Sequence, residues 1–475
     1  MLGRHQPAAA DSPNEPGFQV YTPRDLLLRR AAAVLSSAGC LGVLAWAAFR
    51  MVRGSAKLAS GDFKHFYWAS EAMREGADPY AAGVGGYIYP PLFAWFIQPL
   101  IPLGRVVAER AWGVVNMTLI VASLLLAFRI VRARLRGPAD WLTAAAVCFF
   151  ALGLTVEPVR WEMEEGQTDT VMLLSLTLGL FLLDRFPAAA GAVLALATQI
   201  KHQAVLFLVY LLIRRRWKPA AAMAVAAPLF ALVPLSTMGA GVWSHAMSRA
   251  YGYIAAVFTG APPPEGVNLH PITWELSVSI PSAIARAVET ESGVPKGPLA
   301  ALTLAAAGAA FAVTWALYAA RGVPLFAGRG GRAEREHPGR TLIEWAGLVV
   351  VVLAFSPQTM VRHSFILLPV HALVAYLLLV PKPGLNRWPL LVGTVVYQLG
   401  TRLPPGVEGY EAALAQWRAV GGASWCMLCM WFGLVWTGLG AIRAPYPVQR
   451  RAPLMPDAGN GADTGTGNEP TPAAG

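Results

Sequence analysis

Charged side chains are scarce in this chain: Asp, Glu, Lys and Arg make up 14% of its 475 residues, whereas 55% are hydrophobic. That ratio leaves few charges for the surface of a soluble domain, and several apolar runs approach the roughly 20 residues that a helix needs to cross a bilayer. We therefore expect an all-α polytopic membrane protein. The chain has only four cysteines, all inside predicted spans, where Cys426 and Cys429 are expected to pack within an apolar helix.

Several sequence signatures are also missing. The chain has no glycine-rich phosphate loop after a strand and no paired Asp-x-Asp motif, so neither a metal nor another cofactor is indicated. The first apolar run begins near Ala31 and lacks the small-residue cleavage site of a signal peptide, so we expect it to remain as a span. Residues 1–22 and 444–475 have the composition of disordered tails, which leaves 23–443 as the transmembrane domain.

The positions of the basic residues predict an orientation. The chain carries a net charge of +11, and its Lys and Arg residues gather in clusters that the positive-inside rule places in the cytoplasm. About twelve spans with both termini inside satisfy these clusters: 31–52, 106–128, 139–156, 169–184, 187–200, 203–213, 218–238, 297–320, 341–356, 364–380, 388–400 and 424–442. The positive charge therefore requires no nucleic-acid partner, although it also attracts anionic membrane lipids.

The parity of these spans holds only if residues 88–104 do not cross the membrane. That stretch contains Pro90, Pro91, Pro99 and Pro102, which interrupt a regular helix. We expect an interfacial or re-entrant element buried against the bundle.

Asp62 is the leading candidate for a catalytic base. It follows the first span and precedes an aromatic stretch, a position at the membrane surface where a carboxylate can accept a proton from a sugar hydroxyl. The alternative is a helix N-cap, since Asp before a helical run is also typical of a surface helix.

The same orientation brings two pairs of basic residues to the outer face. Lys201 and His202 lie between two short spans, and Arg362 and His363 precede another. A charge at the bilayer centre costs roughly 2.5 to 3.5 kcal/mol, so these side chains should face protein, water or an anion. Together they predict a phosphate site, with snorkelling of Lys201 to the interface as the alternative.

Several motifs resemble glycosyltransferase family 87, a GT-C-type family of polyprenyl-phosphate-sugar-dependent membrane enzymes. The resemblance spans roughly residues 30–440 and is carried by the following segments: Asp62-Phe63 with its aromatics, Gly76 to Tyr80, Tyr89-Pro90-Pro91-Leu92, Gly166-Gln167, Ala190 to Gln203, and Ser356-Pro357 with His363. The chain departs from the family pattern at Thr168-Asp169, at His202-Gln203 and at Met360-Val361-Arg362.

The resemblance implies a GT-C-type fold with outer-face loops and interfacial helices. It also implies inverting transfer of a sugar, mannose or arabinofuranose, from a polyprenyl-phosphate donor to a glycolipid or cell-envelope glycan at the extracytoplasmic face of the plasma membrane. Asp62 would act as the base and Lys201, His202, Arg362 and His363 would bind the donor phosphate. The expected substrate-binding residues are Lys64, His65, Tyr89, Arg160, Gln167 and Asn268.

Other functions remain open. A transporter or flippase of a lipid-linked intermediate also needs cations along a path, although such proteins typically carry internal repeats that we do not find here. A structural membrane subunit is the third possibility. The acidic residues Glu157, Glu162, Glu164 and Glu165 are expected to lie in a solvated outer loop, and Trp243, Tyr251, Tyr253 and Trp274 are expected to anchor the 239–296 loop at the interface or to form a sugar platform.

Overall fold

The computed structural model describes residues 23–55, 61–81, 86–138, 140–259, 270–326, 337, 339–357, 359–401 and 410–443. All of these belong to one compact unit, which spans residues 20–444. The predicted disordered tails, 1–22 and 444–475, and the predicted substrate residue Asn268 lie outside the described residues.

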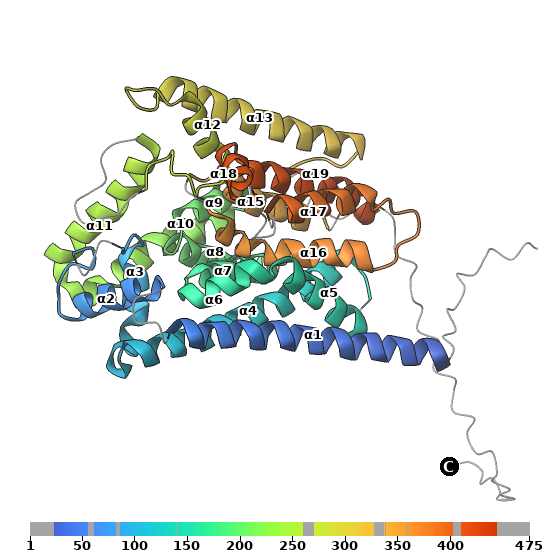
Figure 1. The fold of residues 1–475 in the computed structure, drawn as a ribbon, viewed down its shortest axis with the longest axis horizontal. Helices are drawn as coiled ribbons and strands as arrows, with labels where there is room; N and C mark the ends of the chain where they lie inside the picture. Colours follow the sequence, from blue (N-terminus) through green and yellow to red (C-terminus); the bar gives the residue numbers. More distant parts are fainter. Residues whose placement is uncertain are drawn as a thin grey trace, which may run out of the picture. The chain divides into compact units, whose positions relative to one another are not determined.

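Helices dominate the described residues, and no β-strand occurs among them (Figure 1). The predicted all-α class is therefore confirmed. The elements in chain order are α1 (Pro23–Ser55), α2 (Phe63–Arg74), α3 (Pro91–Ile97), η1 (Gln98–Leu103), α4 (Arg105–Leu135), α5 (Trp141–Leu154), α6 (Val156–Glu165), α7 (Asp169–Leu182), α8 (Pro187–Thr198), η2 (His202–Val205), α9 (Leu206–Ile213), α10 (Trp217–Leu232), α11 (Leu235–Thr259), α12 (Ile280–Val288), α13 (Lys296–Ala320), α15 (Arg340–Phe355), η3 (Val361–Leu367), α16 (Leu368–Leu379), α17 (Trp388–Thr401), α18 (Tyr410–Ala419) and α19 (Gly422–Arg443).

Fewer helices than expected are long enough to cross a membrane. Among the described residues, five are long and apolar enough: α1, α4, α13, η3 continued by α16, and α19. Two bent pairs raise the number to seven, α5 with α6 at 68° and α10 with the first part of α11 at 94°. The other predicted spans form helices of 8 to 16 residues. Since a helix rises about 1.5 Å per residue, these are too short to cover an apolar core of about 30 Å alone, and the predicted count of about twelve is not confirmed among the described residues.

The proline-rich stretch 88–104 forms α3 and η1, two short helices that pack on α2 and α4. Phe66 of α2 meets Phe93 of α3 edge to face with ring centroids 5.0 Å apart. The Tyr67 hydroxyl donates to the carbonyl of Ile101 at 3.1 Å. These contacts fix the position of α2, whose first turn follows Asp62.

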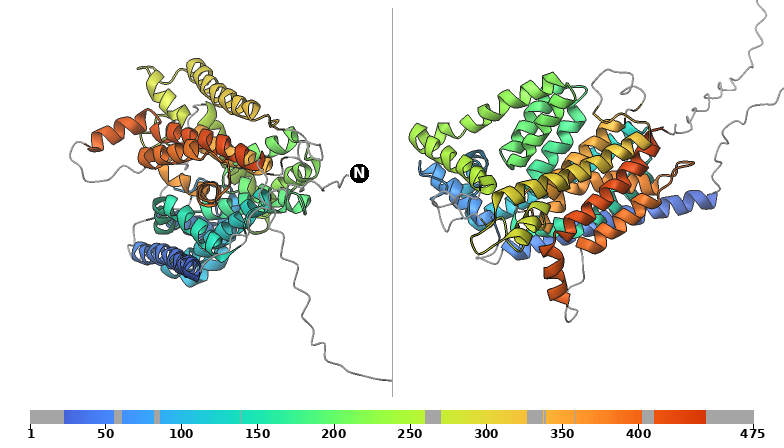
Figure 2. Two further views of the ribbon diagram at one scale, coloured as in Figure 1. Left: turned by 90° about the vertical axis from the view of Figure 1, so that its right-hand side faces the viewer. Right: turned by 90° about the horizontal axis from the view of Figure 1, so that it is seen from above.

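The helices differ in how much of their surface the protein covers. η3 with α16 and α19 are mostly buried, whereas Tyr318 is the one buried residue of α13. Figures 1 and 2 show α13 alongside α19, with which it is in contact. The exposed apolar faces of α1 and α13 suit contact with lipid, as a membrane protein requires.

A buried cluster of ions joins the end of α9 to the start of α15. Arg214 Nε and Arg340 Nε each lie 3.4 Å from the carboxylate of Glu344. The hydroxyl of Tyr210 donates to the same carboxylate at 2.8 Å, and the backbone N–H of Phe326 donates to it at 3.0 Å. The positive-inside rule predicts that such arginines lie at the cytoplasmic surface. In the structure the side chains of Arg214 and Arg340 are buried, and their role is structural.

Candidate active site

The turn between α6 and α7 is fixed from several sides. α6 is capped at its C-terminal end by Gly166, whose φ of 62° lies in the left-handed region that glycine adopts without strain. A Cβ at this position would lie 2.8 Å from the Cβ of Phe63, so glycine also allows α2 to pack closely. Trp112 Nε1 donates to the carbonyls of Gly166 and Gln167 at 3.1 Å, and Asn116 Nδ2 donates to that of Gln167 at 3.1 Å. The side chain of Gln167 therefore projects from a fixed backbone.

Asp62 lies against this turn. Its backbone N–H donates to the carbonyl of Glu165 at 2.9 Å. Asp62 occupies the N-cap position of α2, but its side chain accepts no hydrogen bond from that helix. The geometry therefore gives no support to the capping alternative, since a capping aspartate accepts a backbone N–H bond in the first turn.

The carboxylate of Asp62 has partners from two distant parts of the chain. Gln167 Nε2 and a terminal nitrogen of Arg362 both donate to its Oδ2 atom, the latter at 3.2 Å. Solvent reaches 36% of the Asp62 side chain and 25% of the Arg362 side chain. The structure thus brings together three predicted site residues, in a place that a substrate in solution or at the membrane surface can reach.

A second ion pair lies close by, between Lys201 and Asp169. Lys201 Nζ is 2.6 Å from Asp169 Oδ1, and only 12% and 2% of the two side chains are exposed. The buried carboxylate of Glu162 accepts the backbone N–H of Thr170 at 3.1 Å. η3, which carries Arg362, packs against α6 and α7, which carry Glu162 and Asp169, so Glu162 and the two ion pairs form one ionic cluster. Lys201 therefore has a protein carboxylate as its partner and does not extend alone to the interface.

His363 and Tyr89 border the cluster. His363 Nδ1 accepts the backbone N–H of Met360 at 3.2 Å, which leaves the proton of the neutral ring on Nε2. The pKa of Tyr89 is held well above its ordinary value. The largest cause is loss of hydration, and the negative charges of Asp169 and Asp62 add to it. The Tyr89 phenol therefore keeps its proton, and both side chains are neutral hydrogen-bond donors.

A family model for glycosyltransferase family 87 matches residues 87–330. The matched region spans more than half of the chain and includes Tyr89, Gln167, Asp169 and Lys201, while Asp62 lies outside it. The chain belongs to glycosyltransferase family 87. No curated protein and no solved structure matches the chain. The resemblance found in the sequence motifs is thereby confirmed, and the ionic cluster is the candidate active site of this family 87 glycosyltransferase.

The other predicted site residues among the described ones lie on α2, α6 and η2. Lys64 and His65 follow Asp62 in α2, where the ring of His65 lies against Gly86 and meets Trp68 edge to face. Desolvation lowers the pKa of His65 although Asp62 opposes the shift, so the ring is neutral at pH 7.

Among the described residues, neither Arg160 nor His202 forms a hydrogen bond or ion pair with the residues of the two ion pairs. Arg160 forms ion pairs with Glu157 at 2.8 Å and Glu164 at 3.2 Å along α6. His202 begins η2 next to Lys201, but among the described residues no hydrogen bond or ion pair links it to Asp62 or Arg362. Among the predicted phosphate-binding residues, Lys201, Arg362 and His363 therefore have the stronger claim.

The sequence interpretation missed Glu162. The acidic group was expected in a solvated loop, but it lies in helix α6, and Glu162 is only 3% exposed. Helical periodicity could have predicted the burial of Glu162, because Val159, Glu162 and Met163 fall on one face of α6 and all three are buried. A carboxylate on the apolar face of a helix is a better indicator of a site than its place in an acidic run.

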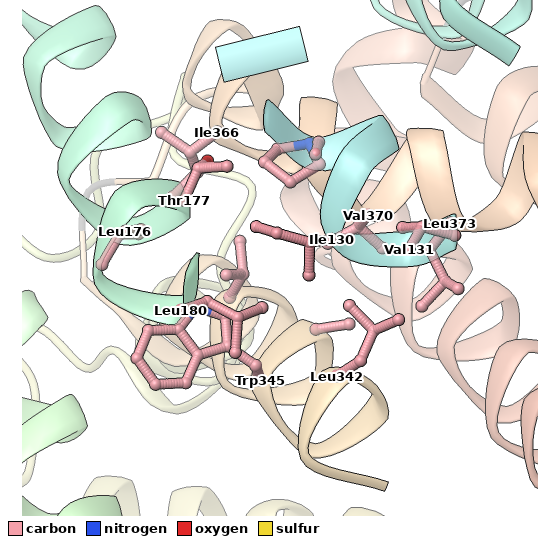
Figure 3. Close-up of a pocket in the computed structure, with 14 residues that line it drawn as sticks. Ile130, Val131, Leu176, Thr177, Leu180, Leu342, Trp345, Ile366, Val370 and Leu373 are labelled. Atoms are coloured by element: carbon pink, nitrogen blue, oxygen red, sulfur yellow. The ribbon is translucent and has the colours of Figure 1, made fainter. Parts of the chain in front are cut away.

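A small apolar cavity of about 30 Å³ lies among α4, α7, α15 and α16 (Figure 3). Ile130, Leu176, Leu180, Trp345 and Val370 are among its lining residues. Such a lining offers little to a sugar or a phosphate. A larger cavity of about 330 Å³ at the C-terminal end of α13, beside Tyr318 and Pro324, has no charged lining residue. Neither cavity therefore offers a charged side chain to a substrate.

Proposed function

We propose that this family 87 glycosyltransferase moves mannose or arabinofuranose from a polyprenyl-phosphate donor to a glycolipid or cell-envelope glycan. Transfer takes place at the extracytoplasmic face of the plasma membrane, with inversion at the anomeric carbon. The observation that carries this proposal is the contact of the Asp62 carboxylate, free of any capping bond, with Gln167 and Arg362. A base and a cation side by side are what displacement of a phosphate by a hydroxyl requires.

In the proposed step, an acceptor hydroxyl attacks the anomeric carbon of the donor sugar. The new carbon–oxygen bond forms as the bond from that carbon to the phosphate oxygen breaks, and the electron pair leaves with the phosphate. Asp62 takes the hydroxyl proton, while Gln167 holds the carboxylate in place. Arg362, Lys201 and the Nε2–H of His363 stabilise the negative charge that develops on the leaving oxygen.

Arg362 is suited to serve both groups at once. One of its terminal nitrogens donates to Asp62, while its buried Nε has no hydrogen-bond partner among the described residues. Because a guanidinium presents five N–H donors in a fixed fork, it can retain Asp62 and still donate to a phosphate oxygen.

The function is tested with purified protein, labelled polyprenyl-phosphate mannose and polyprenyl-phosphate arabinose, and a panel of glycolipid acceptors. We expect the label to move from one donor to an acceptor with release of polyprenyl phosphate. Reconstitution in vesicles distinguishes the alternative: a donor that crosses the bilayer intact, without loss of its sugar, would identify a flippase instead.

The proposed orientation predicts the labelling of introduced cysteines. In a variant without native cysteines, positions 62 and 363 should react with a membrane-impermeant thiol reagent from the outside, and positions 132 and 216 only after the membrane is opened. Reaction of positions 62 and 132 from the same side would contradict the orientation and the extracytoplasmic site.

Donor affinity should depend on Arg362. Arg362→Ala removes a charged hydrogen-bond donor, so binding of the polyprenyl-phosphate sugar should weaken by about 10- to 100-fold. Arg160→Ala is the matched control: it removes an arginine whose partners are Glu157 and Glu164, and donor affinity should change by less than about 3-fold. Equal affinities of the two variants for the donor would contradict the assignment of Arg362 to donor binding and would leave it with a structural role.

A further inference from the structure

The turn that follows α13 has a defined shape. Gly322, two residues past the end of the helix, has a φ of 60°, and its backbone N–H donates to the carbonyl of Ala319 at 2.9 Å. The backbone N–H of Val323 donates to the carbonyl of Tyr318 at 3.1 Å, and both of these side chains are buried. These bonds hold the backbone of Arg321, which lies between Tyr318 and Gly322, in a fixed place.

Two arginines meet at this end of α13. The guanidinium carbon of Arg321 lies 3.7 Å from the centroid of the Trp436 ring in α19. A terminal nitrogen of Arg443, the last residue of α19, donates to the carbonyl of Arg321 at 2.6 Å. Trp436 and Arg443 are two helical turns apart, so they lie on the same face of α19. Both guanidinium groups therefore lie where the ends of α13 and α19 meet.

This pair of positive charges has no acidic partner. Among the described residues no carboxylate forms an ion pair with Arg321 or Arg443, whereas Arg134 and Arg214, at the ends of other helices, each pair with one. The Nε atom of Arg321 also has no hydrogen-bond partner in the described part of the chain. Like charges held close together repel, and an anion between them removes that cost while its oxygens accept from both groups.

An apolar cavity lies next to the two arginines. It is the cavity of about 330 Å³ described above, and Trp315, Ala319 and Gly322 are among its lining residues. Gly322 follows Arg321 in the chain, and a Cβ built on it would lie 3.9 Å from a terminal nitrogen of Arg443. Trp315, Ala319 and Gly322 are all exposed, so the cavity opens at the surface of the protein. An open apolar cavity and two cations therefore adjoin one another.

The surroundings of this site are those of a lipid head group. α13 and α19 are both long and apolar enough to cross a membrane, so their ends lie in the head-group region. We propose that Arg321, Arg443 and the adjacent cavity bind an anionic phospholipid of the membrane. Its phosphate accepts from the two guanidinium groups, and the start of an acyl chain occupies the cavity. A soluble phosphate compound fits less well, because the apolar lining offers nothing to its polar groups.

The competing interpretation is that the two arginines are only topology signals, which attract anionic lipid without a defined site. In that case any exposed arginine should serve as well. Arg185, between α7 and α8, is the matched control: it is exposed, its guanidinium carbon lies 5.3 Å from the centroid of the Phe186 ring, and it does not line the cavity. The two interpretations therefore differ in whether the position of the charge matters.

The test measures binding of phosphatidylglycerol to the purified full-length protein in detergent by native mass spectrometry. Arg321→Gln and Arg443→Gln should each raise the apparent Kd about 10-fold, because each removes a charged hydrogen-bond donor. Arg185→Gln should bind as the wild type does. Ala319→Phe keeps both arginines but fills the cavity from an exposed position of α13, and it should weaken binding as well. Phosphatidylcholine should bind more weakly than phosphatidylglycerol, and inorganic phosphate should not compete.

The site should also be located directly and separated from the active site. A phosphatidylglycerol with a photoactivatable acyl chain should cross-link to residues 315–325, and Arg362→Ala should leave its affinity unchanged. Equal affinities of the Arg321, Arg443 and Arg185 variants would overturn the proposal. So would competition by inorganic phosphate, cross-linking confined to other helices, or loss of phosphatidylglycerol binding in Arg362→Ala. None of these outcomes bears on the proposed transferase function, which the donor assay tests.

Discussion

Asp62→Asn should lower turnover by roughly two orders of magnitude or more while the donor still binds. Asparagine keeps the size of the side chain and an oxygen that accepts from Gln167 and Arg362, but it cannot take the proton of the acceptor hydroxyl. The loss should appear in kcat, measured at saturating donor and acceptor. Arg362 keeps its positive charge in this variant, so the donor affinity should remain close to that of the wild type.

Thermal stability measured alongside turnover separates catalysis from helix capping. Asparagine caps a helix about as well as aspartate, so a capping role predicts nearly normal turnover and unchanged stability. The ion pair of Asp62 with Arg362 is partly exposed, so its loss should change the free energy of unfolding by less than about 1 kcal/mol. Near-normal turnover of Asp62→Asn would reject the assignment of Asp62 as the base.

The largest loss of stability should follow from Glu344→Ala. This carboxylate lies between Arg214 and Arg340, accepts from Tyr210 and from the Phe326 backbone, and is 4% exposed. Removing one partner from a buried ionic cluster typically costs about 3 to 5 kcal/mol, since the remaining charges lose a partner that water cannot replace. Thermal unfolding of the purified protein in detergent should show a clear decrease in Tm.

Glu157→Ala provides the comparison for that experiment. Glu157 also pairs with an arginine, Arg160, but 46% of its side chain is exposed. Its loss should change the stability by no more than about 1 kcal/mol. Equal Tm values for the Glu344 and Glu157 variants would contradict the conclusion that the buried cluster around Glu344 stabilises the fold.

The sequence predicted which residues share a site better than it predicted their partners. Asp62, Gln167 and Arg362 were all predicted to be site residues, and the structure brings Gln167 and Arg362 into contact with Asp62. The pairing of Lys201 with Asp169 was not predicted, because charge patterning along the chain does not reveal which side chains meet across a helical bundle.

The predicted number of about twelve spans is not confirmed, for a similar reason. Apolar runs predict that a segment is buried, but burial in protein and burial in lipid leave the same composition. α8 and α9 are apolar and short, and α10 turns by 94° into α11. These breaks follow from tertiary packing, which a window of hydropathy does not contain. The buried ion cluster around Glu344 was not predicted, because clusters of basic residues in a membrane protein indicate topology first.

The most direct test of the central claim is a structure of the protein with a non-hydrolysable polyprenyl-phosphonate sugar. The account predicts the phosphonate within hydrogen-bond distance of Arg362, with Lys201 and His363 beside it and the anomeric carbon facing the carboxylate of Asp62. A phosphonate bound elsewhere, for example in the cavity beside Tyr318 and Pro324 at the end of α13, would contradict it.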